Sequence, residues 1–178
     1  MSSKDVRATT EVLVVDDEEE IRELVAEFLR ARGVRVTTAA DGRAAIAAIE
    51  REPARYALVL ADLQLPGCDG LDVLRAAKRA NPSVSVVIIT GYASLDSAIE
   101  AVRLGAYDYL TKPFSLGQIE VVLGRLADRA ALEAENRRLL HRLDERDEPE
   151  AASVLMSRLD GIDLRLARIE AALARRPA

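Results

Sequence analysis

The feature that most constrains the fold is a set of five short apolar runs, separated by segments with the periodicity of helices. The runs are rich in β-branched residues and have the length of strands: VLVV (12–15), VRVTT (34–38), ALVLA (57–61), VSVVII (84–89) and YDYL (107–110). Strands that alternate with helices, with central strands that are apolar throughout, predict an α/β fold in which helices cover both faces of a five-stranded parallel sheet. VRVTT alternates between polar and apolar residues, and we therefore expect it at an edge of the sheet.

The chain after Phe114 differs in kind, because it contains no strand-like run and no aromatic residue. A helical pattern starts near Leu116 and continues to about residue 146, where a charged break containing Pro149 interrupts it. A heptad pattern of leucine and isoleucine follows, at Leu155, Leu159, Ile162, Leu166, Ile169 and Leu173. We expect an N-terminal arm (1–10), an α/β domain (11–128), a helical extension of its last helix (129–146), a break (147–153) and a heptad-patterned helix (154–176).

Charges beside the heptad positions favour self-association of this tail. Arg158 and Arg165 fall at g positions. The acidic residues five positions later, Asp163 and Glu170, fall at e positions, which makes complementary pairs for a parallel homodimer. Gly161 weakens the helix. Docking of the tail helices on the α/β domain and an antiparallel arrangement are the alternatives that the pattern leaves open.

Composition is typical of a globular protein, with 49% hydrophobic and 31% charged residues. The sequence contains no apolar run of membrane-spanning length and no signal-like start, and Cys68 is the one cysteine. We therefore expect a cytoplasmic protein without disulfides and without membrane association. The net charge of -5 argues against nonspecific binding of nucleic acid.

Chemically active side chains stand where four of the five strands end. Asp16 and Asp17 follow the first strand, and Asp62 follows the third. Thr90 follows the fourth strand, and Lys112 lies just past the fifth. Ligands of open parallel sheets bind beyond the carboxyl ends of the strands, so we expect these side chains to converge. Three carboxylates close together repel one another unless a cation neutralises them, and oxygen ligands of this kind suit Mg²⁺.

Four motifs resemble, in order and spacing, those of the response regulator receiver domain, the phosphoacceptor module of two-component signalling: VLVVDDE, ADLQLPGCDGLDVL, VVIITGYAS and GAYDYLTKPF. The resemblance covers residues 11–128. It implies a flavodoxin-like (βα)5 domain with strand order 2-1-3-4-5. In this chain an all-helical tail would follow that domain.

The resemblance implies catalytic and switching roles for particular residues. Asp62 is the expected phosphoacceptor, a carboxylate nucleophile that becomes an aspartyl phosphate. Thr90 and Lys112 are expected to contact the transferred phosphoryl group and to offset its charge. Thr90 together with Tyr109 is expected to act as the conformational switch. The Lys112–Pro113 peptide bond is expected to be cis.

The resemblance also implies a metal site, made of Asp17 as a direct ligand, Asp16 acting through water, Asp62, and the backbone carbonyl of Gln64. In isolation, the Asp16–Asp17 pair would be interpreted as the start of a helix. Its alignment with the other strand ends favours the metal site instead. The glutamates that follow, Glu18–Glu20, are interpreted as favourable charges at a helix N-terminus.

Other polar residues receive structural interpretations. Asp41 and Asp69 are expected to be helix caps or turn residues. Cys68 is interpreted as an inert loop thiol, and His141 as a solvated surface residue of a charged helix.

These observations predict a response regulator that is phosphorylated on Asp62 by a sensor histidine kinase or a phosphotransfer protein, with Mg²⁺ as cofactor. The domain would catalyse its own phosphotransfer and its own dephosphorylation and would have no separate substrate. We expect phosphorylation to change the face near the fourth and fifth helices. The helical tail is expected to form a homodimer or to contact a downstream protein partner.

Two further kinds of function use the same topology. Residues 91–114 resemble receivers that precede an ATPase and a helix-turn-helix, so a DNA-binding transcriptional regulator, or a piece of one, is an alternative; the tail is too short for an ATPase and contains no P-loop. A flavin-binding enzyme would need a small polar phosphate loop where DDEEE stands, and a phosphatase would need Asp-x-Asp there. The sequence disfavours both of these enzymes.

Overall fold

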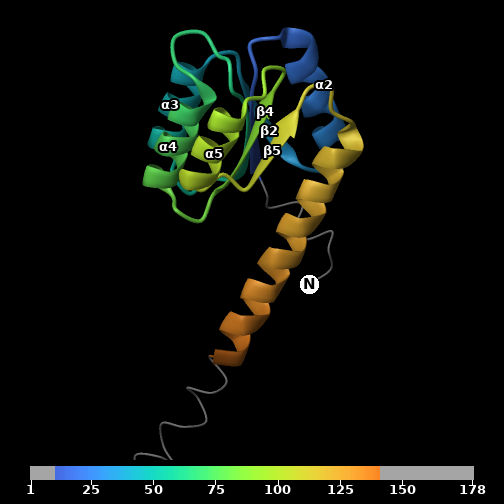
Figure 1. The fold of residues 1–178 in the computed structure, drawn as a ribbon. Helices are drawn as coiled ribbons and strands as arrows, with labels where there is room; N and C mark the ends of the chain where they lie inside the picture. The colour runs from blue at the N-terminus through green and yellow to red at the C-terminus, as the bar shows by residue number, and fades with distance from the viewer. Residues whose placement is uncertain (1–10, 141–178) are drawn as a thin grey trace, which may run out of the picture. The chain divides into compact units, whose positions relative to one another are not determined.

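The sheet expected from the apolar runs is present in the structure, a computed structural model that describes residues 11–140. Its five parallel strands are ordered β2-β1-β3-β4-β5, which confirms the implied strand order. Figure 1 shows the sheet with helices on both of its faces. The strands are β1 (Glu11–Val15), β2 (Arg35–Ala39), β3 (Tyr56–Asp62), β4 (Ser85–Thr90) and β5 (Asp108–Thr111). Each strand end lies within one residue of its predicted position, and β2 is an edge strand as expected.

Two sets of helices cover the two faces of this sheet. The helices are α2 (Glu19–Arg30), α3 (Gly42–Arg51), α4 (Gly70–Ala80), α5 (Leu95–Arg103) and a last one described over residues 116–140, here called the C-terminal helix. One hydrophobic cluster joins the sheet to α3, α4 and α5, and the other joins it to α2 and the C-terminal helix. Within β1, Leu13 and Val15 belong to the first cluster, whereas Val12 and Val14 belong to the second. A strand buried on both faces must be apolar at every position, which explains the continuous run.

Short polar side chains fix where three of the helices begin. Asp41 precedes α3 and accepts a hydrogen bond from the first turn of that helix at 2.7 Å. Asp69 precedes α4 and forms a reciprocal capping box with Asp72. The predicted cap roles of Asp41 and Asp69 are therefore confirmed. Ser94 and Ser97 form a second capping box at the start of α5, where they satisfy backbone N–H groups that have no partner within the helix.

The chain divides into two compact units, Met1–Arg129 and Ala130–Ala178. In the second unit, residues 130–140 are helical, and their leucines are exposed: Leu132, Leu139 and Leu140. The predicted break, the heptad-patterned helix and His141 lie outside the described residues, so the arrangement of the tail stays a prediction. Within the described part of the chain, no helix combines the length and the apolar character needed to cross a membrane.

Candidate functional site

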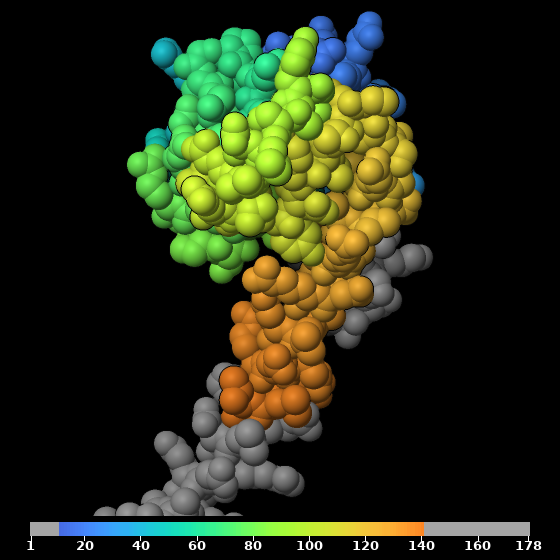
Figure 2. All heavy atoms as spheres, in the orientation of Figure 1, coloured from blue at the N-terminus to red at the C-terminus, as the bar shows by residue number. Residues whose placement is uncertain are grey.

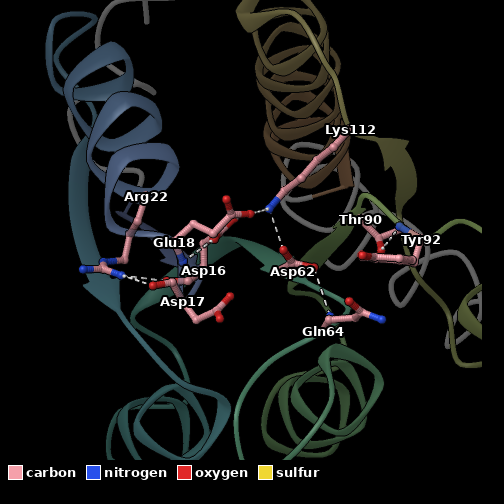
Figure 3. Close-up of polar contacts among 9 residues, drawn as sticks. All are labelled: Asp16, Asp17, Glu18, Arg22, Asp62, Gln64, Thr90, Tyr92 and Lys112. Carbon is pink, nitrogen blue, oxygen red and sulfur yellow. Dashed lines mark hydrogen bonds and ion pairs between the residues drawn. The ribbon is translucent and has the colours of Figure 1, made fainter.

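The register of the sheet brings the predicted site residues to one end of it. The residue before Asp16 on β1 pairs with the residue before Asp62 on β3. Thr90 at the end of β4 pairs with the residue before Lys112 on β5. Carboxylate oxygens of Asp16, Asp17 and Asp62 lie within 4.8 Å of one another. The residues predicted at the strand ends therefore meet in space, as Figure 3 shows.

Lys112 is the positive centre of this cluster. Its Nζ donates hydrogen bonds to Asp62 Oδ2 at 2.6 Å, Glu18 Oε1 at 2.9 Å and Asp16 Oδ2 at 3.0 Å (Figure 3). Burial lowers the pKa of Lys112, but the hydrogen bonds to the three carboxylates outweigh burial and raise that pKa above its ordinary value. The ammonium is therefore charged at neutral pH.

Glu18 belongs to the site, although its sequence position did not indicate this. Glu19 and Glu20 lie in the first turn of α2, where their charges favour the helix start as expected. Glu18 is the N-cap residue of α2, so it too lies at the helix start, as expected. It also forms an ion pair with Lys112, which is 94 residues away in the chain, and the sequence position did not indicate this second contact.

Asp16 and Asp62 are buried, with 4% and 6% of their surface exposed, whereas Asp17 is exposed. Burial raises the pKa of Asp16, and its hydrogen bonds with Lys112 and with the backbone N–H of Glu18 offset this only in part. Three carboxylates carry more negative charge than one ammonium balances. The excess charge and the oxygen-only donor set fit a hard divalent cation such as Mg²⁺.

One local arrangement recurs after three strands and orients the side chains of the site. A side-chain oxygen accepts a hydrogen bond from the backbone N–H two residues later: Asp16 Oδ1 from Glu18 at 2.9 Å, Asp62 Oδ1 from Gln64 at 3.0 Å, and Thr90 Oγ1 from Tyr92 at 3.0 Å. Lys112 Nζ donates a hydrogen bond to the other oxygen, Oδ2, of both Asp16 and Asp62. Since Thr90 Oγ1 is the acceptor in its turn, the Thr90 hydroxyl group can still donate a hydrogen bond.

Arg22 holds the loop that carries Asp16 and Asp17. Its guanidinium donates to the backbone carbonyl of Asp16 at 2.8 Å and to that of Asp17 at 3.4 Å (Figure 3). Binding of these two carbonyl oxygens to Arg22 restricts the backbone of the loop while the carboxylates face the cluster. Sequence analysis missed Arg22, because a basic residue in a helix that follows a strand is too common to indicate a role.

Tyr109 lies beside the cluster and not in it. It pairs with Ile88 across the sheet and packs, partly buried, against the hydrophobic cluster of α3, α4 and α5. Its hydroxyl lies 3.0 Å from Ser97 Oγ on α5. The neighbouring Lys112–Pro113 peptide bond is cis, as predicted.

Two further predicted residues lie in the loop between β3 and α4. Gln64 is exposed and lines an open pocket together with Asp17 and Ser97. Burial, followed by the nearby carboxylates, raises the pKa of the Cys68 thiol, which agrees with its interpretation as an inert thiol.

Gly70 allows α4 to approach the backbone of Asp62 closely. A Cβ atom at position 70 would lie 2.3 Å from the carbonyl oxygen of Asp62 and 2.9 Å from Cα of Leu63. The N–H of Gly70 donates to the carbonyl of Leu63 at 2.8 Å. The start of α4 therefore positions the strand end that carries Asp62. The Asp69–Gly70 pair indicates a turn or helix boundary from its sequence, and α4 does begin there, but the sequence did not indicate the close approach to Asp62.

We expect Gly70→Ala to lower the free energy of unfolding by about 2–3 kcal/mol, because its methyl group would meet backbone atoms that cannot rotate away. Gly124→Ala is the matched control. In the C-terminal helix, a Cβ at position 124 would meet nothing within 4 Å, and alanine should stabilise that helix by about 0.5–1 kcal/mol. Urea denaturation measures both changes. A Gly70→Ala variant as stable as the native protein would contradict the close approach.

Comparison with protein families identifies one match to the domain that contains this site. Residues 12–123 match the response regulator receiver domain. The putative response regulator NtrX-like of Rickettsia bellii (strain RML369-C) is 35% identical over 128 residues, which are 71% of this chain and 26% of that protein. The probable transcriptional regulatory protein TcrX of Mycobacterium tuberculosis is 40% identical over 121 residues, which are 68% of this chain and 51% of that protein. The matched part of this chain thus spans about a quarter to a half of the length of these relatives.

Solved structures with the same fold include both isolated domains and longer chains. A response regulator receiver domain protein from Clostridium thermocellum is 30% identical with a TM-score of 0.65, over 69% of this chain and 98% of that one. The beryllofluoride-activated NtrC4 receiver domain dimer is 32% identical with a TM-score of 0.62, over 67% and 97%. NtrX from Brucella abortus in complex with ADP is 38% identical with a TM-score of 0.64, over 74% and 30%.

Proposed function

Because the chain belongs to the response regulator receiver family of two-component signalling, we propose that it is a switch controlled by Mg²⁺-dependent phosphorylation of Asp62. The observation that supports this proposal is the cluster of three carboxylates, Asp16, Asp17 and Asp62, with oxygens within 4.8 Å of one another. The ammonium of Lys112 contacts two of them, Asp16 and Asp62. The phosphoryl donor would be a sensor histidine kinase or a phosphotransfer protein.

Asp62 acts as the nucleophile in this proposal. Its carboxylate oxygen forms a bond to phosphorus, the bond between phosphorus and the donor breaks, and the electron pair of that bond leaves with the donor. Lys112, whose Nζ lies 2.6 Å from Asp62 Oδ2, balances charge on the phosphoryl group, and the Thr90 hydroxyl donates to one of its oxygens. Bound Mg²⁺ would supply the remaining positive charge, held by Asp16, Asp17, Asp62 and the carbonyl of Gln64.

The aspartyl phosphate would be removed by hydrolysis, in which water attacks phosphorus, the bond between phosphorus and the Asp62 oxygen breaks, and inorganic phosphate leaves while Asp62 regains its carboxylate form. The domain then catalyses only its own phosphorylation and dephosphorylation, without a separate substrate. Thr90 and Tyr109 are proposed to shift when the phosphoryl group is present.

The output is proposed to pass through α5 and the C-terminal helix, which are the fourth and fifth helices of the domain. Leu95, Ile99 and Val102 lie along one side of α5 and are exposed, with 77% of Leu95 and 71% of Val102 accessible. Figure 2 shows this helix, in yellow-green, on the face turned to the viewer. An exposed apolar stripe is typical of a contact surface, and the similar NtrC4 receiver domain is a dimer. We therefore propose a homodimer or a downstream protein partner at this face, with the helical tail contributing.

Two alternatives from the sequence fare differently. A transcriptional output stays an alternative, because TcrX, about half of which this chain matches, is a probable transcriptional regulatory protein. The flavin-binding alternative loses support, because acidic groups from β1 and β3 crowd the strand ends where a flavin phosphate would have to bind. The phosphatase alternative is disfavoured by the sequence alone, which has Asp16-Asp17-Glu18 where Asp-x-Asp would be needed.

We expect the native protein to gain the mass of one phosphoryl group when it is incubated with a small-molecule phosphodonor and Mg²⁺. The same incubation with a chelator in place of Mg²⁺ should leave the mass unchanged, because the uncompensated carboxylates would repel an anionic donor. Intact-protein mass spectrometry measures both samples. Equal modification with and without Mg²⁺ would contradict the role of the metal. Light scattering on the same samples would relate the oligomeric state to the modification.

A further inference from the structure

We propose that Arg22 is a positioning residue for the metal site, because it fixes the backbone from which the Asp17 carboxylate reaches the cation. The first part of the proposal concerns the bonds between Arg22 and the loop after β1, and it needs no bound ion. The second part rests on the Mg²⁺ site of the proposed function and adds that Arg22 sets the affinity of that site.

Asp17 differs from the other two carboxylates of the cluster in how its side chain is held. Asp16 and Asp62 each accept one hydrogen bond from a backbone N–H and another from Lys112. Among the described residues, 11–140, the carboxylate of Asp17 accepts no hydrogen bond and forms no ion pair. The position of this carboxylate therefore depends on the backbone that carries it.

Arg22 binds the backbone on both sides of Asp17. Its NH1 donates to the carbonyl of Asp16 at 2.8 Å, in the peptide unit before Asp17, and to the carbonyl of Asp17 at 3.4 Å, in the unit after it. Peptide units are planar, so φ and ψ are the only free backbone rotations at Asp17. Holding both units restricts both rotations and with them the direction of the side chain. Figure 3 shows Arg22 reaching this loop from α2, on the side away from Asp62.

The guanidinium of Arg22 makes these bonds although acidic partners are close in the sequence. Four glutamates lie within four residues of it: Glu18, Glu19, Glu20 and Glu23. In the part of the chain that the structure describes, Arg22 nevertheless forms no ion pair with a carboxylate. Its side chain is half-buried against the loop. The contacts of Arg22 are therefore with backbone carbonyls and not with a counter-charge.

The charge of Arg22 and its hydrogen bonds act on a bound cation in opposite directions. A guanidinium near the site repels the cation, so loss of its charge alone would lower the Kd for Mg²⁺. Loss of the hydrogen bonds would raise the Kd, because the freed backbone must be ordered again when the ion binds. Groups that orient a metal ligand without touching the metal typically contribute about ten- to a hundredfold in affinity. The sign of the change in Kd therefore separates the two effects.

Two substitutions and a control separate the hydrogen bonds from the charge. Arg22→Met removes both. Arg22→Lys keeps the charge, but its nitrogen stands one bond closer to the backbone than NH1 and cannot reach the carbonyls. Arg30→Met is the matched control: it removes the same charge from α2, where Arg30 pairs with Glu23 at the exposed surface.

Amide hydrogen exchange of the whole chain in the presence of a chelator tests the first part. The amides of Asp16 and Glu18, which are hydrogen-bonded in this loop, should exchange about tenfold faster in both Arg22 variants, because a bond to a charged donor is lost. Arg30→Met should exchange like the native protein. Native exchange rates in Arg22→Lys would overturn the hold of Arg22 on the loop, and this variant decides the question even if Arg22→Met does not fold.

Isothermal titration calorimetry with Mg²⁺, without any phosphodonor, tests the second part. The Kd should rise about tenfold or more in both Arg22 variants and stay native in Arg30→Met. A lower Kd in Arg22→Met with a native Kd in Arg22→Lys would show that Arg22 acts through its charge alone and would overturn the positioning role. A native protein that binds no Mg²⁺ would contradict the metal site of the proposed function, whereas exchange with chelator would still decide whether Arg22 holds the loop.

Discussion

Lys112→Met is expected to lower the free energy of unfolding by about 3 kcal/mol when a chelator removes divalent cations. The side chain of Lys112 is 13% exposed, and those of Asp16 and Asp62 are 6% and 7% exposed. Removal of the ammonium leaves two buried carboxylates without their counter-charge. Methionine keeps an unbranched side chain, one heavy atom shorter than that of lysine, and donates no hydrogen bond. Urea denaturation measures the loss.

Mg²⁺ should restore much of this stability, because a cation bound to the folded state alone stabilises it by about 2.7 kcal/mol at a hundred times its Kd. The increase should be larger for Lys112→Met than for the native protein, in which Lys112 already occupies the carboxylates. Glu18→Gln is the matched control. It removes a partner of Lys112 whose side chain is 59% exposed, and we expect a change below about 1 kcal/mol. Equal effects of Mg²⁺ on both proteins would contradict competition between the cation and Lys112.

Asp62→Asn is expected to slow phosphorylation by at least about a thousandfold, because an amide oxygen is not a nucleophile and removal of a nucleophile generally has effects of this size or larger. The variant should show no added mass under conditions that modify the native protein fully. The substitution is close to isosteric, and the oxygen that accepts from Gln64 N–H at 3.0 Å can be kept. The expected loss is therefore chemical and not a consequence of unfolding.

Asp41→Asn is the control for this substitution. Asp41 caps α3, and asparagine is an equally good cap, so the variant should be modified like the native protein. Peptide mapping of the native product should place the phosphoryl group on the segment that contains Asp62. An Asp62→Asn variant that still gains the phosphoryl group would show that another side chain is the acceptor.

The strands and the strand-end residues could be predicted because their causes are local. The central strands β1, β3 and β4 are buried on both faces and are therefore almost continuously apolar, whereas the edge strands β2 and β5 were recognised by their length and residue types. All five strands lie within one residue of their predicted positions. In a parallel sheet all carboxyl ends lie at one edge. Placement of Asp62 near Asp16 and Lys112 therefore followed from the strands themselves, once the resemblance supplied their order.

The residues that were missed depend on contacts between distant segments. Glu18 was assigned to the helix start, yet it binds Lys112. Gly70 follows Asp69 at a turn or helix boundary, and nothing in the sequence shows that a Cβ there would collide with the backbone of Asp62. Ser97 received no role from the sequence, yet its hydroxyl lies 3.0 Å from that of Tyr109. A sequence pattern contains information on periodicity and local propensity. These contacts between distant segments affect neither the periodicity nor the propensity, so the pattern does not reveal them.

The amino-acid sequence alone determined that helices cover both faces of an apolar parallel sheet and that acidic, hydroxyl and basic side chains follow its strands. The reason is that a parallel strand buried on both faces has to be apolar, and that the carboxyl ends of parallel strands lie at the same edge of the sheet. The folded structure alone decided which groups are in contact: the three carboxylates that bind the ammonium of Lys112, the start of α4 against the backbone of Asp62, and the Ser97 hydroxyl beside that of Tyr109. Such contacts are set by distances of a few ångströms between segments far apart in the chain, and hydrogen bonds and steric clashes are sensitive to distances of that size.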